Sequence, residues 1–157
     1  MMKPIRFLSV LMIVLVLCCG CQRTVNPEQK GNITLYQMAD DGSKLQSSEY
    51  EIQADQEDNV AVIQELLDCF KKCVAIDNFQ LKEKQLTITF LSSYYNQDKI
   101  DEVLNRAAIV KTLCQLSSVE YVEFYVGDNP LVIDGETVGI MSKLSFLDSV
   151  GGEGYTQ

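Results

Sequence analysis

Two segments of the chain carry the apolar spacing of an α-helix, and each lies between short alternating segments. The first covers residues 60–73, with acids over residues 55–58 before its start and Lys71 and Lys72 in its last turn. The second covers residues 98–116. Apolar residues in both recur every three or four positions, which places them along one side of each helix. Such helices need an apolar surface against that side, so the chain is limited to folds in which they pack together or on a sheet.

The segments around the helices alternate polar and apolar residues, which is the pattern of half-buried strands. These segments are 33–36, 50–52, 79–81, 86–90 and 120–126. The polar residues 82–85 predict a hairpin, and glycine-containing clusters at 127–130 and 134–136 predict further turns. The order strand, helix, hairpin, helix, strand predicts an α+β fold, with two helices packed on one face of a small mixed sheet.

The amino-terminal segment is typical of an exported protein. Lys3 and Arg6 precede an apolar run over residues 7–17 that is interrupted only by Ser9. A membrane-spanning helix needs about 20 apolar residues, so the run is short for a permanent span. Residues 1–20 are therefore interpreted as a signal peptide, with an uncleaved single-pass anchor as the alternative.

A glycine directly before a cysteine ends this run, at Gly20 and Cys21. The arrangement resembles the lipobox of bacterial lipoproteins, whose cysteine receives lipid, including palmitate, and becomes the first residue of the mature chain. Cys21 is therefore the predicted lipid attachment residue. Cys18 stands where such sequences usually have Leu, Val or Ile, and cleavage before Cys19 is the other interpretation.

Residues 21–31 are polar and are interpreted as a lipidated tether. Two or more fatty chains make attachment stable, because each buried methylene contributes about 0.8 kcal/mol. Ten extended residues span about 35 Å, so the tether can hold the folded part clear of the lipid headgroups. The expected location is the cell membrane, with the protein lipid-anchored on the extracytoplasmic face.

Charge and composition exclude several classes of function. Removing residues 1–20 takes away two of the 13 cations and none of the 22 acids, so the net charge changes from −9 to −11. Nucleic acid is not an expected partner, since its binding needs clustered Lys and Arg. The chain has no histidine, which excludes Ser-His and Cys-His nucleophiles as usually built and removes the commonest zinc ligand.

Three cysteines lie in the part expected to fold, at Cys69, Cys73 and Cys114. An odd number does not make a closed disulfide framework, and this part has no fourth Cys or His to complete a zinc site. No metal and no cofactor are therefore predicted. The cysteines are interpreted as small apolar core residues, with a bridge between Cys73 and Cys114 as the alternative.

The second helical segment has apolar residues on two sides. One side has Ile100, Val103, Leu104, Ala107, Val110 and Cys114. Ile109, Leu113 and Leu116 fall toward the second side. Either this end of the helix is buried all round, or the second side is an exposed patch that contacts another chain. Under the latter interpretation these three residues contact an envelope protein or a second copy of this chain.

Five short sequences keep the order and spacing of a known domain. They are ITLY at 33–36, ELL at 65–67, LTITF at 86–90, AIVKTL at 108–113 and VEFYVG at 122–127. Together they resemble a GerMN domain, the sporulation and spore germination domain found on bacterial lipoproteins. The likeness covers residues 32–147, and residues 148–157 are interpreted as a flexible tail.

The resemblance implies a non-enzymatic role, with no catalytic residue and no cofactor. It also implies a fold similar to the ring-building motifs of secretion systems and of the sporulation channel. Some members have two such domains, whereas this chain has room for one. Residues 72–78 lack the Gly- and Pro-rich loop that often follows the first helix. We therefore expect a general role in envelope or sporulation and germination assembly, rather than one named step.

Two other classes of function stay open at this point. Paired acids can do general acid and base chemistry if their surroundings separate their pKa values. The candidate acids are Asp40, Asp41, Asp134 and Glu136. Asp128 and Asn129, or residues 134–136, offer oxygens to calcium or a small ligand, although their spacing is not that of an EF-hand. The sequence favours a non-catalytic, protein-binding lipoprotein, with an extracytoplasmic ligand- or calcium-binding module as the alternative.

Overall fold

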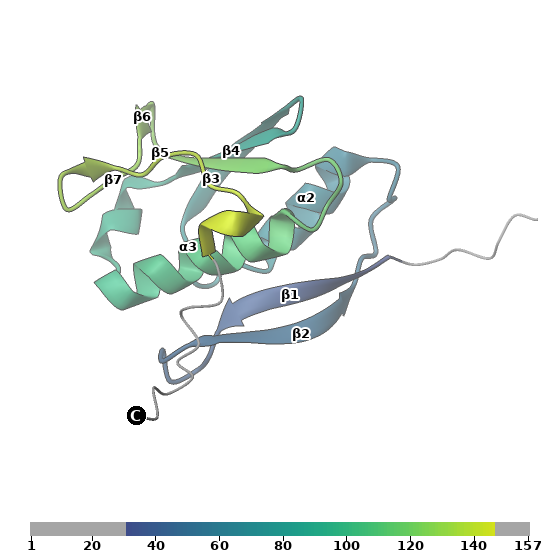
Figure 1. Cartoon of the computed structure of the whole chain (residues 1–157), viewed down its shortest axis with the longest axis horizontal. Coiled ribbons are helices and arrows are strands. Elements are labelled where there is room, and N and C mark those ends of the chain that lie inside the picture. Colours follow the sequence, from purple (N-terminus) through teal and green to yellow (C-terminus); the bar gives the residue numbers. More distant parts are fainter. Residues whose placement is uncertain (1–30, 147–157) are drawn as a thin grey trace, which may run out of the picture.

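The computed structural model describes residues 31–146, which form an α+β domain with two α-helices (Figure 1). The helices are α2 (Asn59–Asp68) and α3 (Lys99–Leu113). The strands are β1 (Asn32–Met38), β2 (Leu45–Glu51), β3 (Ile76–Lys82), β4 (Gln85–Phe90), β5 (Tyr121–Val126), β6 (Asn129–Pro130), β7 (Val132–Ile133) and β8 (Glu136–Thr137). Two 3₁₀-helices, η1 (Ser92–Asn96) and η2 (Lys143–Phe146), complete the described elements. The predicted fold class is confirmed.

The larger sheet has the strand order β3-β4-β5-β6 and contains the predicted hairpin. β3 and β4 are antiparallel, whereas β4 and β5 are parallel and are joined through η1 and α3. Parallel neighbours require a crossover connection of this kind. Leu86 lies opposite Val122 and Ile88 lies opposite Phe124, and all four side chains are fully buried. One face of this sheet is therefore packed into the core.

β1 and β2 form a separate antiparallel hairpin on the other side of the helices (Figure 1). The sequence predicted a sheet on one face only, whereas α3 lies between the larger sheet and β1. The reason is the alternation within β1, which places Ile33 and Leu35 on the same face, each 6% exposed. The hairpin thus supplies a second apolar surface to the same core.

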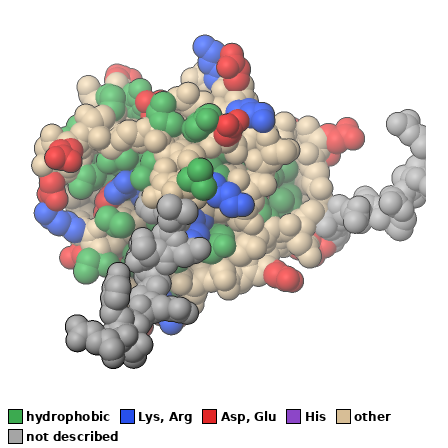
Figure 2. Space-filling model, in the orientation of Figure 1, with side chains coloured by type: hydrophobic (Ala, Val, Ile, Leu, Met, Phe, Trp, Pro, Cys, Tyr) green, Lys and Arg blue, Asp and Glu red, His purple; other side chains and the backbone are tan. Residues whose placement is uncertain are grey.

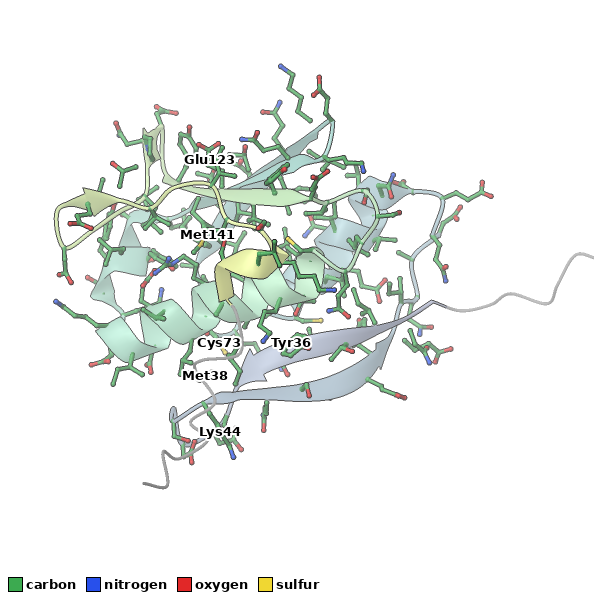
Figure 3. All side chains as sticks on the ribbon, in the orientation of Figure 1. Tyr36, Met38, Lys44, Cys73, Glu123 and Met141 are labelled. Carbon is green, nitrogen blue, oxygen red and sulfur yellow. The ribbon has the colours of Figure 1, made fainter. Side chains whose placement is uncertain are left out.

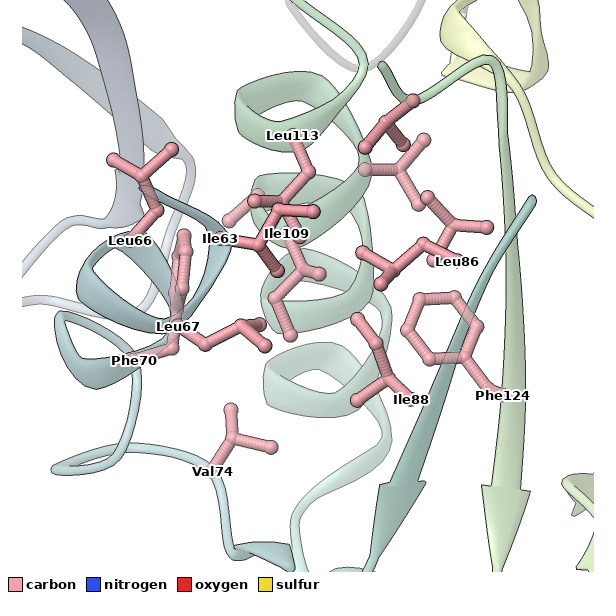
Figure 4. Packing of buried hydrophobic residues seen from close by; sticks show 14 of the residues in the cluster. Ile63, Leu66, Leu67, Phe70, Val74, Leu86, Ile88, Ile109, Leu113 and Phe124 are labelled. Atoms are coloured by element: carbon pink, nitrogen blue, oxygen red, sulfur yellow. The ribbon is translucent and has the colours of Figure 1, made fainter. Parts of the chain in front are cut away.

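The core lies where these layers meet, and Figure 4 shows how its side chains pack. Its fully buried members include Ile63, Leu66 and Leu67 of α2, Ile109 and Leu113 of α3, and Leu86, Ile88 and Phe124 of the larger sheet. Burial of one such side chain stabilises the fold by roughly 1.5–3 kcal/mol. Contacts between segments distant in the sequence therefore hold both helices in place.

α2 begins as predicted but ends early. The Asp58 carboxylate accepts hydrogen bonds from the backbone N–H groups of Val60 and Ala61, which caps the helix start. The helix ends at Asp68, so Lys71 and Lys72 lie beyond it rather than in its last turn. The chain turns there, and Phe70 and Val74 reach the core from the turn. Apolar spacing alone does not distinguish a turn of this kind from another turn of helix.

α3 starts after Asp98, whose carboxylate accepts a hydrogen bond from the N–H of Ile100. Its apolar residues are not buried as expected. Ile100 and Val103 are 63% and 40% exposed, because the amino-terminal half of α3 has a side that neither sheet covers. The predicted core side of this helix is therefore wrong at its amino-terminal end.

The predicted contact surface on α3 is also corrected. Ile109 and Leu113 are fully buried, and Leu116 is half-buried against the core. The carboxyl-terminal half of α3 is covered by the larger sheet on one side and by β1 on the other. The alternative interpretation, burial all round, holds for this half, and the Ile109 and Leu113 side chains are unavailable for contact with another chain.

Candidate interaction surfaces

Asp40, Asp41 and Asp134 lie in two hairpin turns, and Glu136 is the first residue of β8. Asp41 accepts hydrogen bonds from the hydroxyl and the backbone N–H of Ser43, and these bonds lower the pKa of its carboxyl. Asp134 forms an exposed ion pair with Lys99, with Nζ 2.7 Å from Oδ1. Within residues 31–146, no group of three or more His, Cys, Asp or Glu residues is arranged to hold a metal ion.

The three cysteines within the described range are free thiols, so the bridge between Cys73 and Cys114 is not formed. Cys69 and Cys114 are half-buried against the core, where burial raises the pKa of both thiols. Cys73 is exposed instead. Its interpretation as a core residue is wrong, because the chain leaves the helical path after Asp68.

Cys21, the predicted lipid attachment residue, lies outside the described residues, as do the signal peptide and most of the tether. Within residues 31–146, neither helix has the length and the apolar character needed to cross a bilayer. Lipid attachment therefore stays a prediction from the sequence.

A buried polar cluster joins η1, α3 and the carboxyl-terminal segment. Glu102 accepts a hydrogen bond from the Tyr94 hydroxyl at 2.9 Å and two from the Arg106 guanidinium at 2.8 and 3.0 Å. The Glu102 and Arg106 side chains are only 6% and 11% exposed. Arg106 Nη1 also lies 3.6 Å from the Met141 sulfur, and Figure 3 shows Met141 beside α3. The cluster thus connects η1, α3 and the carboxyl-terminal segment, and its polar groups bond to one another rather than line a binding site.

Tyr94 gives this cluster a testable pH dependence. Burial, followed by the charge and hydrogen bond of Glu102, raises the pKa of the Tyr94 phenol above its ordinary value of 10.0. Below pH 10 the phenol is protonated in both folded and unfolded chains, so its stabilising effect is fully present. Above pH 10 it ionises first in the unfolded chain, and the free energy of unfolding should fall by up to about 1.4 kcal/mol per pH unit.

We expect the variant Tyr94→Phe to show a weaker fall in stability than the wild type between pH 9.5 and 11 in urea titrations. Phenylalanine keeps the stacking on Phe90, whose ring centroid is 4.0 Å away. Tyr95→Phe is the control, since Tyr95 is 50% exposed and should leave the alkaline profile unchanged. Equal alkaline profiles for the wild type and Tyr94→Phe would contradict the assignment.

The outer edge of β1 is closed by one side chain of α3, Thr112, and one just beyond its end, Gln115. The backbone N–H groups of Thr34 and Tyr36 donate to Gln115 Oε1 and Thr112 Oγ1, at 3.1 and 3.0 Å. Gln115 Nε2 donates in turn to the Thr34 carbonyl at 2.7 Å. Tyr36 lies between β1 and α3 in Figure 3, with Lys111 Nζ 5.1 Å from its ring centroid. No further strand can therefore pair on this side of the hairpin.

The opposite edge of the hairpin, along β2, is open. The backbone N–H and C=O groups of Thr34 and Tyr36 point toward α3. Those of Ile33 and Leu35 therefore point toward β2, where they face Tyr50 and Ser48. Backbone groups alternate along a strand, so those of Ser47 and Glu49 point away from β1. Both residues are exposed. No group within residues 31–146 bonds to the outward backbone groups of Ser47 and Glu49, so β2 presents donors and acceptors in the form that a further strand would need.

Glu65 on α2 holds the end of β2 in place. Its carboxylate accepts hydrogen bonds from the Tyr50 hydroxyl at 2.8 Å and from the backbone N–H groups of Gln53 and Ala54 at 2.9 and 2.7 Å. Partial burial acts to raise the pKa of Glu65, but these bonds outweigh it and the pKa is lowered. The carboxylate is therefore charged at neutral pH and fixes the position of β2 relative to α2.

A groove of about 670 Å³ runs between this hairpin and α2. It is lined by Leu35, Gln37, Tyr50, Ala61, Gln64, Glu65, Asp68, Cys69 and Lys72. Its lining includes the apolar residues Leu35 and Ala61 and the polar residues Gln64 and Asp68. The groove borders the open strand, so the two features form one surface, which we call the β2 surface.

A second exposed region lies near the amino-terminal half of α3. Figure 2 shows hydrophobic side chains more densely over the β7–β8 hairpin and this part of α3 than over the rest of the face in view. Its exposed apolar residues include Ile100, Val103, Val132 and Ile140. Charged side chains lie among them, so the hydrophobic area is discontinuous.

Neither the β2 surface nor the buried cluster was predicted from the sequence. Residues 46–49 are all polar, so no alternation marks this part of β2 as a strand, and only its end at 50–52 was predicted. Glu102 and Arg106 are four residues apart on a helix, which is a visible signal for an ion pair. Their burial depends on η1 and residue 141, which sequence spacing does not reveal.

Comparison with known proteins places this geometry among described domains. A family model described as "Sporulation and spore germination" matches residues 34–132. The first GerMN domain of the sporulation protein GerM from Bacillus subtilis has a TM-score of 0.54 and 14% identity, over 69% of this chain and 94% of that one. The tandem GerMN domains of the same protein give a TM-score of 0.52 and 12% identity, over 72% of this chain and 47% of that one. No curated protein matches the chain.

Proposed function

Because this chain belongs to the sporulation and spore germination family, we propose that it is a membrane-anchored lipoprotein that acts through protein contacts. Its role would be non-catalytic, in assembly of the cell envelope during sporulation or germination. The matched residues span more than half of the chain, and this membership is the observation that carries the proposal.

Two features of the chain support a non-catalytic role. Histidine is absent, which removes the usual activating base of a nucleophile. Asp41 and Asp134 already have hydrogen-bond or ion-pair partners within their own turns or nearby, as expected for solvated structural acids. The quadruple variant Asp40→Asn, Asp41→Asn, Asp134→Asn and Glu136→Gln should therefore keep the function of the wild type.

Membrane attachment through Cys21 follows from the lipobox-like residues 18–21. Several fatty chains on one cysteine hold a protein stably, and the polar tether allows the domain to stand away from the surface. We place the domain on the extracytoplasmic face of the cell membrane. There it can reach other envelope proteins, which are its proposed partners.

Cys21→Ser is expected to abolish lipid attachment. Mass spectrometry of the product made with its native signal should show acyl mass on the wild type and none on this variant, which should also leave the membrane fraction. Cys69→Ser is the control, because this half-buried thiol lies within the folded domain. Loss of acyl mass in Cys19→Ser, with retention in Cys21→Ser, would move the attachment to Cys19. An unmodified amino end on a membrane-bound wild type would indicate an uncleaved anchor.

The assembly role is tested by complementation in the native cells. Deleting the gene should reduce the yield of heat-resistant spores or their germination, and the wild type and the quadruple acid variant should both restore it. Cys21→Ser should restore neither the yield of heat-resistant spores nor their germination. Failure of the quadruple variant, with its fold intact by circular dichroism, would favour a catalytic or ion-binding role for the turns.

A further inference from the structure

We propose that the β2 surface binds an extended, basic segment of a partner protein by strand addition. The segment would pair with the open edge of β2 and place alternate side chains over the groove beside α2. This inference names the chemistry of the partner in the assembly role proposed above, and it rests on that role.

The edge of β2 is better suited to pairing than other edges of the domain. The outer edge of β1 is occupied by Gln115 and Thr112. β3, at the edge of the larger sheet, has a register shift between Ile76 and Asn78. Such irregularities make an edge strand less able to pair with a further strand. β2 keeps an uninterrupted register from Leu45 to Glu51 and contains no proline. It therefore offers a regular row of backbone groups for a further strand.

The two faces of an added strand would meet different surroundings. Tyr50 and Ser48 share the inner face with the buried residues Ile33 and Leu35, because directly opposite residues point the same way. Glu49 lies opposite Thr34 on the outer face. Side chains of an added strand would therefore alternate between the groove and the outer face that carries Glu49.

Charge on the outer face determines the partner's chemistry. Glu49 is exposed, and the described residues form no ion pair with it. Residues 45–51 include Glu49 and Glu51 but no cation. Opposite charges across neighbouring strands stabilise pairing, whereas like charges oppose it. Lysine or arginine at alternate positions of the added strand is therefore favoured.

A second copy of this chain is a poorer occupant. Pairing of β2 with the β2 of a second copy would bring together two strands that contain acids and no cation, on proteins whose net charge without residues 1–20 is −11. Like-signed proteins repel each other at moderate ionic strength. On the groove side, Leu35 and Ala61 favour medium-sized apolar side chains at the positions of the added strand that alternate with its cations. The pattern expected in the partner strand is thus a basic residue alternating with an apolar one.

The test uses the full chain in detergent micelles and a dye-labelled heptapeptide amide in which lysine and valine alternate. Fluorescence anisotropy measures binding, and hydrogen-deuterium exchange with mass spectrometry locates it. We expect saturable binding that weakens with salt, together with slower exchange over residues 45–51. The same peptide with N-methyl groups on alternate residues cannot pair along the strand and should lose this protection.

Matched variants separate strand addition from general attraction of a cation to an acidic protein. Glu49→Lys should weaken peptide binding by about tenfold, since it replaces attraction by repulsion across the pair. Glu136→Lys makes the same charge change on the exposed β8 and should leave binding within about twofold of the wild type. A peptide alternating glutamate and valine should not bind.

Three outcomes of the binding and exchange measurements would overturn the proposal, as would one outcome of spore complementation. Equal losses in Glu49→Lys and Glu136→Lys would mean non-specific charge attraction. Full binding of the N-methylated peptide would exclude backbone pairing. Concentration-dependent protection of β2 without any peptide would identify a second copy as the occupant. Spore complementation by Glu49→Lys at wild-type level would overturn only this inference, whereas failure of the deletion to affect spores would overturn the assembly role itself.

Discussion

Replacing Leu113 with lysine is expected to unfold the domain. Leu113 is 0% exposed and packs with Ile109 and Ile63 in the hydrophobic core (Figure 4). The substitution removes a buried apolar side chain and places an unpaired cation in its position. Effects of this kind exceed about 4–5 kcal/mol, which approaches the whole stability of a small domain. Circular dichroism should show no cooperative thermal transition near that of the wild type.

Ile100→Lys is the matched control, on the same helix and with the same change of side chain. Ile100 is 63% exposed, so the expected change in the free energy of unfolding is within about 0.5 kcal/mol. The milder Leu113→Ala keeps the test quantitative if the lysine variant cannot be purified, and should lose about 2–5 kcal/mol. A folded Leu113→Lys protein with near-native stability would restore this side of α3 as a surface for partner contact.

The second large effect is expected from Glu102→Ala, which should lower the free energy of unfolding by about 3–5 kcal/mol. The substitution leaves the Arg106 guanidinium buried without its carboxylate and removes the acceptor of the Tyr94 hydroxyl. The loss of an ion-pair partner inside a protein is far more destabilising than the loss of one at its surface. Urea denaturation at neutral pH measures the difference.

Asp134→Asn is the control for an exposed pair, since Asp134 and Lys99 are 65% and 77% exposed, and should change stability by about 0–1 kcal/mol. The triple variant Tyr94→Phe, Glu102→Leu and Arg106→Met removes every polar member of the cluster. It should recover a large part of the stability lost in Glu102→Ala, because no buried polar group is then left unpaired. If Glu102→Ala were as mild as Asp134→Asn, the cluster would contribute little to the fold.

The periodic segments of the fold were predictable because one face of each element is buried and the other is exposed, which gives a regular sequence pattern. Leu86, Ile88 and Phe90 alternate, and the strand they predicted is β4. Element ends were less predictable. The apolar spacing that predicted a helix to Cys73 continues through a turn, since Phe70 and Val74 reach the core without helical geometry. Burial patterns therefore identify an element but do not show where its backbone changes direction.

The site was less predictable than the fold. Ile109 and Leu113 were candidate contact residues because they lie off the main apolar side of their helix, and a helix with one sheet would expose them. The β1–β2 hairpin covers that side, so they are core residues. In contrast, β2 became a candidate surface because its residues are polar and its edge is unpaired, and neither property gives a periodic signal.

The sequence by itself determined the α+β class, helix starts close to residues 60 and 98, and the family resemblance, because local periodicity acts within a few residues. Tertiary structure decided which side of α3 is buried, which carboxylate is enclosed with Arg106, and which strand edge stays open. These outcomes depend on how segments far apart in the chain pack against one another. A residue's own neighbours in the sequence do not contain that information.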